Sequence, residues 1–115
     1  MVLNFICRTI YLEDILRCSF NLNKTELKIL KHLLERKEEL TIEEIQKKIK
    51  KDRTTIQRSV KKLHQKELIH RRQLNLKNGG YVFIYSPKPK KELKEQVFQI
   101  FEGFKNSVAK EIQQW

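Results

Sequence analysis

The sequence predicts a single, mostly helical domain that carries one β-hairpin. Apolar residues recur at helical spacing along most of the 115 residues. Two stretches typical of helix starts, Asn23-Lys24-Thr25-Glu26 and Thr41-Ile42-Glu43-Glu44, lie among them. The pair Asn78-Gly79, a strong signal for a tight hairpin turn, separates two stretches rich in β-branched and aromatic residues. A chain of this length, with 39% hydrophobic residues, can bury a core of its own.

The first predicted helix covers residues 2–18, in one or two pieces. Its apolar residues fall on more than one face, and a helix that is apolar all round is a buried helix. In so small a chain, we expect it to be buried against a second subunit.

Three further helices are predicted between residues 24 and 66. Asn23 and Thr41 are expected to cap the first two, each with a glutamate three residues later that reaches back to the capping residue. Asp52 is placed to cap the third, which runs to about residue 66.

Leu68–Leu76 and Tyr81–Tyr85 are predicted strands. The intervening Asn78-Gly79 pair predicts a type I′ turn, in which both central residues need positive φ. Ile69 and Leu74 cannot share a face of a regular strand, so we expect a bulge or a late strand start. Three helices followed by this hairpin, with a short turn between the second and third helices, give the order of a winged helix-turn-helix.

Pro87 and Pro89 are expected to end the hairpin and to open a terminal helix. The apolar residues of that helix fall within an arc of about 100°. The helix is about 38 Å long, more than the core needs for cover. Part of each terminal helix is therefore left for contact with a second subunit. The residues expected there are Leu3, Ile6, Ile10, Leu93, Val97, Ile100, Phe101, Phe104, Val108 and Ile112.

We thus expect one winged-helix domain over residues 1–115. It comprises an N-terminal helix over 1–20, a winged helix-turn-helix core over 23–86 and a C-terminal dimerisation helix over 88–115.

The net charge of +11 is concentrated in one quarter of the chain. Residues 47–72 carry 11 basic and two acidic side chains, a net charge of +9, whereas residues 1–46 carry a net charge of −1. Clustered like charges repel one another unless a polyanion neutralises them, so the cluster indicates a nucleic-acid surface.

The helix at about residues 52–66 has a polar, non-acidic face. With Ile56, Val60 and Leu63 directed to the core, the spacing of 100° per residue places hydrogen-bond donors on the opposite face. Arginine can bridge guanine, glutamine can pair with adenine, and threonine can meet a thymine methyl group or a phosphate. We therefore predict that this helix enters the major groove. The DNA-binding residues predicted on it are Arg53, Thr54, Thr55, Arg58, Lys61, Lys62 and Gln65.

The hairpin, at about residues 71–85, is the predicted wing. Its basic side chains Arg71, Arg72 and Lys77 are predicted to reach the DNA backbone or the minor groove. Its aromatic residues could stack on bases, but in such strands they more often pack on the core or on neighbouring helices.

The stretch LTIEEIQKKIKKDRTTIQRSVKKLHQKELIHRR, followed by LNLKNGGYVFIYSP, resembles the winged helix-turn-helix domain of MarR-type and TrmB-type transcriptional regulators, which are common in archaea. Asp52-Arg53-Thr54-Thr55-Ile56 through Leu63 matches the recognition helix of that family, and Leu63–Arg71 matches its pattern L-x-x-K-x-L-I-x-R. The resemblance implies a homodimer that is built from the N- and C-terminal helices and has one recognition helix per subunit in successive major grooves. Full-length TrmB proteins also carry a large sugar-binding domain. Because this chain ends at Trp115, we do not expect sugar sensing.

The sequence shows no catalytic, metal-binding or cofactor-binding pattern, so we expect neither an enzyme nor a cofactor. Cys7 and Cys18 have no partner at metal-ligand spacing, and in an apolar helical region we expect buried, inert thiols, with redox sensing as the alternative. The two cysteines, the absence of a long apolar run and the N-terminal sequence predict a cytoplasmic, nucleoid-associated protein with no membrane partner.

These observations predict a sequence-specific, double-stranded DNA-binding transcriptional regulator that acts as a homodimer, and we expect it to be a repressor. Two alternatives stay open: a non-specific architectural or nucleoid protein, and a protein-interaction subunit of a transcription complex. The sequence does not decide whether a small-molecule effector exists.

Overall fold

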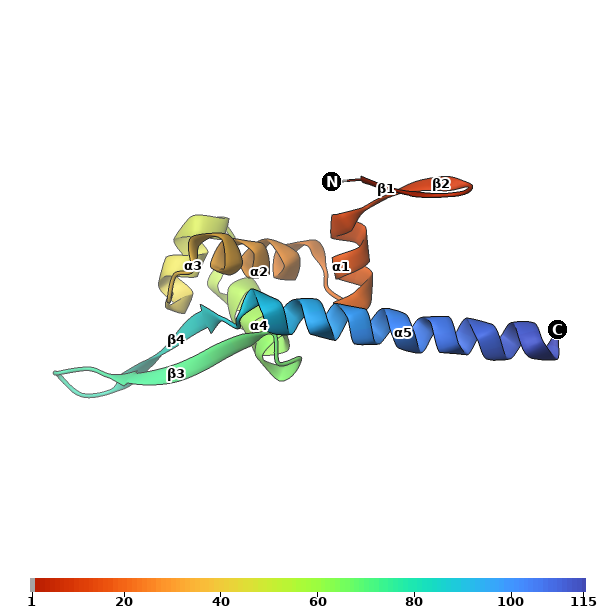
Figure 1. Cartoon of the computed structure of the whole chain (residues 1–115). Helices are drawn as coiled ribbons and strands as arrows, with labels where there is room; N and C mark the ends of the chain where they lie inside the picture. Colours follow the sequence, from red (N-terminus) through yellow and green to blue (C-terminus); the bar gives the residue numbers. More distant parts are fainter. Residues whose placement is uncertain (1) are drawn as a thin grey trace. The chain divides into compact units, whose positions relative to one another are not determined.

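The computed structural model describes residues 2–115. It divides the chain into two compact units (Figure 1). The winged-helix unit is Asn23–Lys90, and the terminal unit joins the residues up to Leu22 with Lys91–Trp115. The elements, in chain order, are β1 (Val2–Phe5), β2 (Arg8–Tyr11), α1 (Leu12–Phe20), α2 (Lys24–Arg36), α3 (Ile42–Ile49), α4 (Arg53–Gln65), β3 (Ile69–Asn75), β4 (Tyr81–Pro87) and α5 (Lys90–Gln114).

The winged-helix unit contains the three predicted helices, and the predicted caps are confirmed. The backbone N–H of Glu26 donates to Asn23 Oδ1 over 2.8 Å, and that of Glu44 donates to Thr41 Oγ1 over 3.2 Å. Asp52 accepts from the backbone N–H of Thr55 at the start of α4. Each cap satisfies a backbone donor that a helix start otherwise leaves without a partner.

Helix α4 packs its apolar stripe into the core of this unit. Ile56, Val60 and Leu63 are at most 1% exposed, as the sequence predicts. Leu33 of α2 and Ile45 of α3 are also almost fully buried. Burial of each such side chain contributes roughly 1.5–3 kcal/mol, so the core face of α4 is set firmly and its opposite face is left to solvent.

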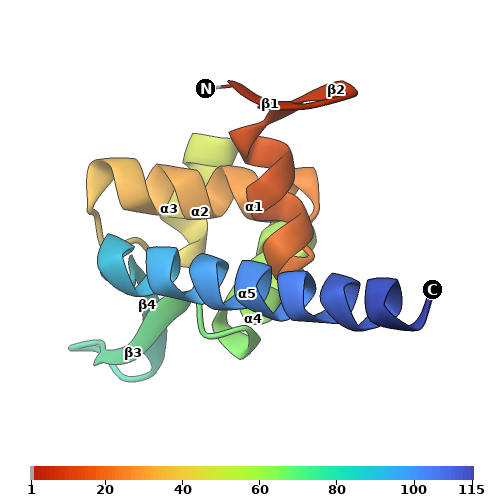
Figure 2. The ribbon, with the colours of Figure 1, turned by 45° about the vertical axis from the view of Figure 1, so that its right-hand side comes forward.

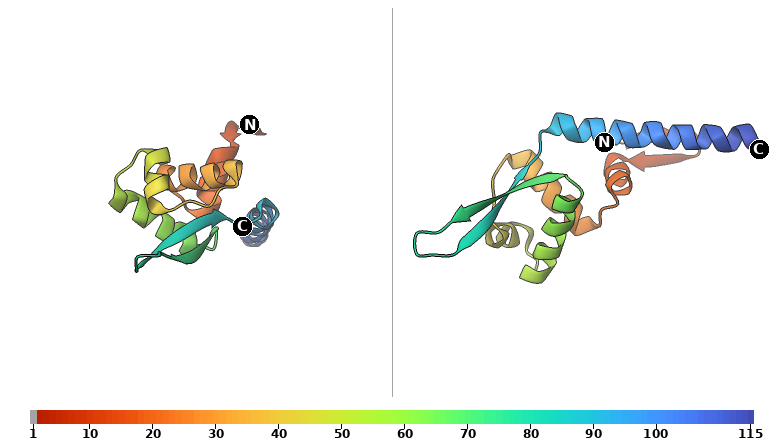
Figure 3. Two further views of the ribbon diagram at one scale, coloured as in Figure 1. Left: turned by 90° about the vertical axis from the view of Figure 1, so that its left-hand side faces the viewer. Right: turned by 90° about the horizontal axis from the view of Figure 1, so that it is seen from below.

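Strands β3 and β4 form the wing. They pair antiparallel from Ile69 opposite Pro87 to Asn75 opposite Tyr81. Leu40, in the connection between α2 and α3, exchanges two backbone hydrogen bonds of 2.8 Å with Tyr85 and so ties the wing to the helices. Figures 1 and 3 show the far end of the hairpin reaching away from the helices of its unit.

Two predictions about the hairpin are wrong. The positive φ angles belong to Gly79 and Gly80, at 91° and 78°, and not to Asn78. The N–H of Gly79 donates to the carbonyl of Leu76, whose own N–H donates to the carbonyl of Gly80. A three-residue loop, in which a turn is followed by a residue with positive φ, therefore replaces the type I′ turn.

The expected bulge is also absent from β3. Its register with β4 is unbroken, and Ile69 is 1% exposed whereas Leu74 is 41% exposed. The two side chains lie on opposite faces of the strand. Leu74 lies in the part of the wing that extends beyond the core, so its side chain is not required to face the core.

The predicted helix over residues 2–18 is wrong in its first half. Residues 2–11 form the antiparallel hairpin β1–β2, in which Leu3 lies opposite Ile10, and helix α1 begins only at Leu12. Six of the ten residues 2–11 are β-branched or aromatic, which favours strands. Ile6 is fully exposed at the hairpin tip in the single chain, and its burial against a second subunit stays a prediction.

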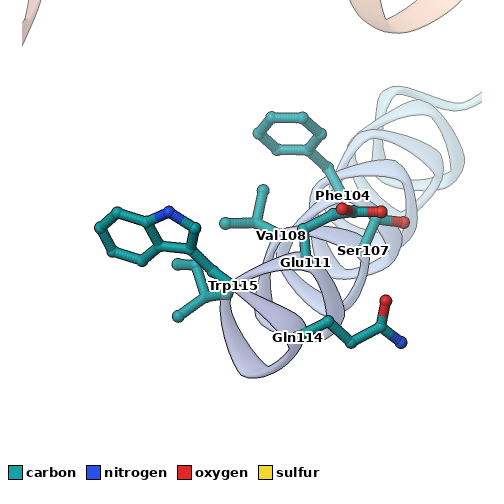
Figure 4. Close-up of a pocket in the computed structure, with 7 residues that line it drawn as sticks. Phe104, Ser107, Val108, Glu111, Gln114 and Trp115 are labelled. Carbon is teal, nitrogen blue, oxygen red and sulfur yellow. The ribbon is translucent and has the colours of Figure 1, made fainter.

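Helix α5 is one uninterrupted helix of 25 residues, as predicted (Figure 2). Beyond Leu93, which is buried, and the half-buried Val97, its apolar stripe is open to solvent. Phe104, Val108 and Trp115 point to the same side of the helix in Figure 4. The stripe residues Ile100, Phe101, Phe104, Val108 and Ile112 are between 38% and 66% exposed.

No helix within residues 2–115 is long and apolar enough to cross a membrane. Cys7 and Cys18 are both free and exposed, so the single chain does not bury the two thiols as expected. Cys7 lies in the turn between β1 and β2, and Cys18 lies on an exposed part of α1.

Candidate nucleic-acid interface

The structure places the polar face of α4 in solvent. Thr54, Arg58, Lys61 and Gln65 are exposed on the side opposite the buried stripe. No acidic residue occurs in Arg53–Gln65. The helix is about 20 Å long, and a helix of ordinary diameter fits the major groove, which is about 12 Å wide. This face can therefore present several donors to base edges at once.

The first turn of α4 is organised by its cap. Asp52 accepts from both the hydroxyl and the backbone N–H of Thr55. These two hydrogen bonds, the hydroxyl first, hold the pKa of Asp52 below its ordinary value. Thr55 is half-buried and its hydroxyl is engaged within the chain, whereas Arg53 and Thr54 are exposed.

Lys62 lies on the flank of α4 that faces α2. Its Nζ is 3.9 Å from Oε2 of Glu26, a carboxylate that is itself buried. Lys62 thus differs from Lys61, for which the described residues provide no ion-pair partner.

The three basic residues predicted on the wing have different surroundings. Arg72 donates from Nε and Nη2 to Oε2 of Glu39, over 3.2 and 2.6 Å. Both side chains are about half exposed, and such surface pairs contribute only about 0–1 kcal/mol, so a phosphate can compete for Arg72. Lys77 is exposed in the loop at the tip.

Arg71 is held by the aromatic residues of β4. Its guanidinium carbon lies 4.2 Å from the centroid of the Phe83 ring, a cation–π geometry. Tyr81 meets Phe83 edge-on with centroids 5.4 Å apart. Tyr85 is buried, as expected for this strand, and its burial raises its pKa. Tyr81 remains exposed, so the expected packing holds for only part of the strand.

His64, in the last turn of α4, has a lowered pKa. Burial lowers the pKa of His64 below its ordinary value of 6.5, and the positive charges of Arg71 and Lys88 lower it further. His64 is therefore neutral at pH 7 and can accept as well as donate a hydrogen bond.

Sequence reasoning did not name one exposed polar residue of α4 and two of the wing. Gln57 is exposed on α4. Gln73 and Asn75 share the wing face of Arg71, and the amide of Gln73 donates to Asn75 Oδ1 over 3.1 Å. Strict alternation from Arg71 along the strand would have found the last two.

The side chains of this face are suited to binding. Within residues 2–115, no group of three or more histidine, cysteine or acidic residues could hold a metal ion. The face offers cations, amides and hydroxyls, which recognise phosphates and base edges.

Comparison with known proteins agrees with this geometry. The sequence profile described as the sugar-specific transcriptional regulator TrmB matches residues 16–91. The uncharacterized protein MJ1503 of Methanocaldococcus jannaschii is 28% identical over 114 residues, which cover 99% of this chain and 86% of that protein.

Solved structures give the same result. A possible transcriptional regulator from Methanosarcina mazei superposes with a TM-score of 0.93 and 34% identity, covering 100% of this chain and 97% of the other. A mutant of S. aureus MepR bound to an oligodeoxyribonucleotide shares the fold, with a TM-score of 0.58 and 17% identity over 85% of this chain and 71% of MepR. Family and fold are those of transcriptional regulators. The chain belongs to the TrmB family of transcriptional regulators and has their winged helix-turn-helix.

Proposed function

We propose that this protein regulates transcription by binding specific sites on double-stranded DNA as a homodimer. The observation that carries the proposal is the exposed, acid-free face of α4, set by the burial of Ile56, Val60 and Leu63. The net charge of +9 over residues 47–72 supplies attraction to phosphates. The MepR structure, which has an oligodeoxyribonucleotide bound to the same fold, supports this use of the fold.

In this proposal α4 lies in the major groove. Arg58 and Gln65 read base edges, while Lys61 binds a phosphate. Arg53, Thr54 and Thr55 contact the backbone or bases near the N-terminus of the helix. The wing places Arg71, Arg72 and Lys77 on the backbone or in the minor groove. Lys62 is a weaker contact because of its ion pair with Glu26.

The proposed dimer is supported by apolar surface on the terminal unit. The stripe of α5 from Ile100 to Ile112 is exposed, and so is Leu3 on the N-terminal hairpin. Phe101 and Phe104 line a surface cavity of about 640 Å³ together with Ile10 of β2. Large contiguous apolar patches are uncommon on the surface of monomeric proteins and often mark an interaction surface. Leu93 is already covered within the single chain, so the rest of the stripe carries the proposed contact.

The test is selection of bound fragments from genomic DNA of the source organism at about 150 mM salt, where non-specific binding is weak. The wild-type protein is compared with the double variant Arg58→Ala, Lys61→Ala. A second double variant, Lys94→Ala, Lys110→Ala, removes the same charge from exposed positions of α5. We expect enrichment of one or a few palindromic sites, lost only in the α4 variant. Uniform recovery of fragments would indicate an architectural protein instead, and no recovery would indicate a protein partner.

A further inference from the structure

One cation of helix α4 is paired with a buried acid from another helix. Lys62 Nζ lies 3.9 Å from Glu26 Oε2, and the two side chains are 59% and 2% exposed. A buried carboxylate without a nearby cation is strongly destabilising. The pair therefore holds the Lys62 ammonium close to α2 although most of the side chain is in solvent.

The two oxygens of Glu26 have different surroundings. Oε1 accepts from the backbone N–H of Asn23 over 3.0 Å and completes the capping box of α2. Oε2 is buried and has no hydrogen-bond partner among residues 2–115. Its compensation comes from Lys62, at an ion-pair distance that is longer than a hydrogen bond.

A second capping box in the same chain shows that capping alone does not require this arrangement. Glu44 occupies the equivalent position of α3 and accepts from the backbone N–H of Thr41 over 3.1 Å. Its side chain is exposed. Burial of the glutamate and its pairing with α4 are thus particular to Glu26.

We infer that Glu26 is a positioning residue that holds Lys62 against α2 and withholds one positive charge of α4 from DNA. The inference rests on the proposed DNA-binding function. A phosphate that approaches Lys62 must compete with a carboxylate that cannot move into solvent, because the cap and the core hold it. Lys61, the preceding residue of the helix, has no such competitor among the residues that the structure describes, so its charge is available to a phosphate.

The first experiment tests the pair without DNA, by urea denaturation. Lys62→Ala leaves the buried carboxylate of Glu26 without compensation, so we expect a lower urea midpoint. Adding Glu26→Gln, which keeps an acceptor for Asn23 but removes the charge, is expected to recover most of that loss. Lys61→Ala is the matched control and should change the midpoint little. Equal midpoints for the two lysine variants would overturn the inference.

The second experiment measures affinity for a random-sequence duplex over a salt series. Releasing one lysine to a phosphate steepens the slope of log K against log salt by about 0.9, which is about fivefold in affinity at 0.15 M salt. We expect this gain for Glu26→Gln. Glu44→Gln, with the same charge change in the exposed capping box, should gain less than about twofold.

The combined variants separate the possible explanations. In the Lys62→Ala background, Glu26→Gln should gain no more than Glu44→Gln does, because the residue it acts through is gone. A fivefold gain that persists there, a gain in the wild-type background that only equals that of Glu44→Gln, or a loss of affinity would overturn the inference while leaving the proposed function intact. If the wild-type protein binds no DNA at all, the proposed function fails as well, and a positive urea result would then mark the pair as purely structural.

A further comparison covers the case in which Glu26→Gln does not fold. Lys62→Met and Lys61→Met are compared on the same duplex, under conditions where circular dichroism shows both to be folded. If Glu26 withholds Lys62 from DNA, Lys62→Met should lose clearly less affinity than Lys61→Met, for which we expect a loss of about fivefold. Equal losses would overturn the inference.

Discussion

Single side chains on α4 and the wing differ in how freely they can meet DNA. Arg58 and Lys61 are exposed with no acidic neighbour on their helix, whereas Thr55, Lys62 and Arg72 are engaged with Asp52, Glu26 and Glu39 respectively. The exposed face could be predicted from the sequence because helical spacing alone defines it. The ion pairs could not, because they join residues more than 30 positions apart along the chain.

Arg58→Ala is expected to weaken binding to the target site by about 1–3 kcal/mol, because a bidentate contact to guanine is lost. Fluorescence titration on the target and on a random duplex measures both affinities. The loss on random DNA should be smaller, since only the phosphate attraction changes there. Equal losses on the two duplexes would show that Arg58 does not read a base.

His64 is expected to make the free energy of unfolding decrease as the pH is lowered. Its folded pKa lies below its ordinary value of 6.5, because of burial and nearby cations. As the pH falls, His64 is protonated first in the unfolded chain, which lowers the free energy of unfolding. The contribution of neutral His64 to stability is therefore complete above about pH 6.5 and is lost as the pH falls toward the folded pKa. Urea denaturation at pH 7.5 and 5.5 measures it. His64→Gln should show a smaller decrease than the wild type, and an unchanged decrease would contradict the assignment.

At the scale of elements, the helices and the wing follow from local signals. The capping boxes at Asn23 and Thr41 and the core stripe of α4 predict three helices correctly, because these signals act within one or two turns. The N-terminal hairpin could not be predicted in this way. Leu3, Ile6 and Ile10 have helical spacing, yet Leu3 and Ile10 also pair across two strands. Spacing alone does not separate those two structures in so short a segment.

Replacement by alanine at two different glycines should change the free energy of unfolding in opposite directions. Gly79 has a φ of 91° in the wing loop, so Gly79→Ala should lower the free energy of unfolding by about 1–2 kcal/mol. Gly103 lies within α5 with no atom near an added Cβ, so Gly103→Ala should raise it by about 0.5–1 kcal/mol. Thermal denaturation measures both changes. Equal shifts in one direction would contradict the backbone geometry described here.

At the scale of the whole molecule, the terminal unit presents apolar surface that a single chain does not cover. The α5 stripe continues past the buried Leu93 to Ile112, and Phe104 in its middle is 66% exposed. The sequence predicts this stripe from its narrow arc, although it does not show which part the chain itself buries. A second copy of the chain covers the remainder in the proposed dimer.

Phe104→Glu is expected to dissociate this dimer, because it places an unpaired charge within an apolar contact. Sedimentation velocity at micromolar concentration measures the change. Asn106→Glu adds the same charge to α5 outside the stripe and should leave the dimer intact. A Phe104→Glu variant that sediments as a dimer would place the interface elsewhere.

The central claim is that α4 reads sequence rather than charge alone. The most direct measurement is the ratio of affinities for the enriched genomic site and for a scrambled duplex of equal length, in competition at about 150 mM salt. Sequence-specific regulators exceed a ratio of about 10³, and we predict at least that value for the wild-type protein. A ratio near one would contradict the claim and identify a protein that binds DNA without regard to sequence.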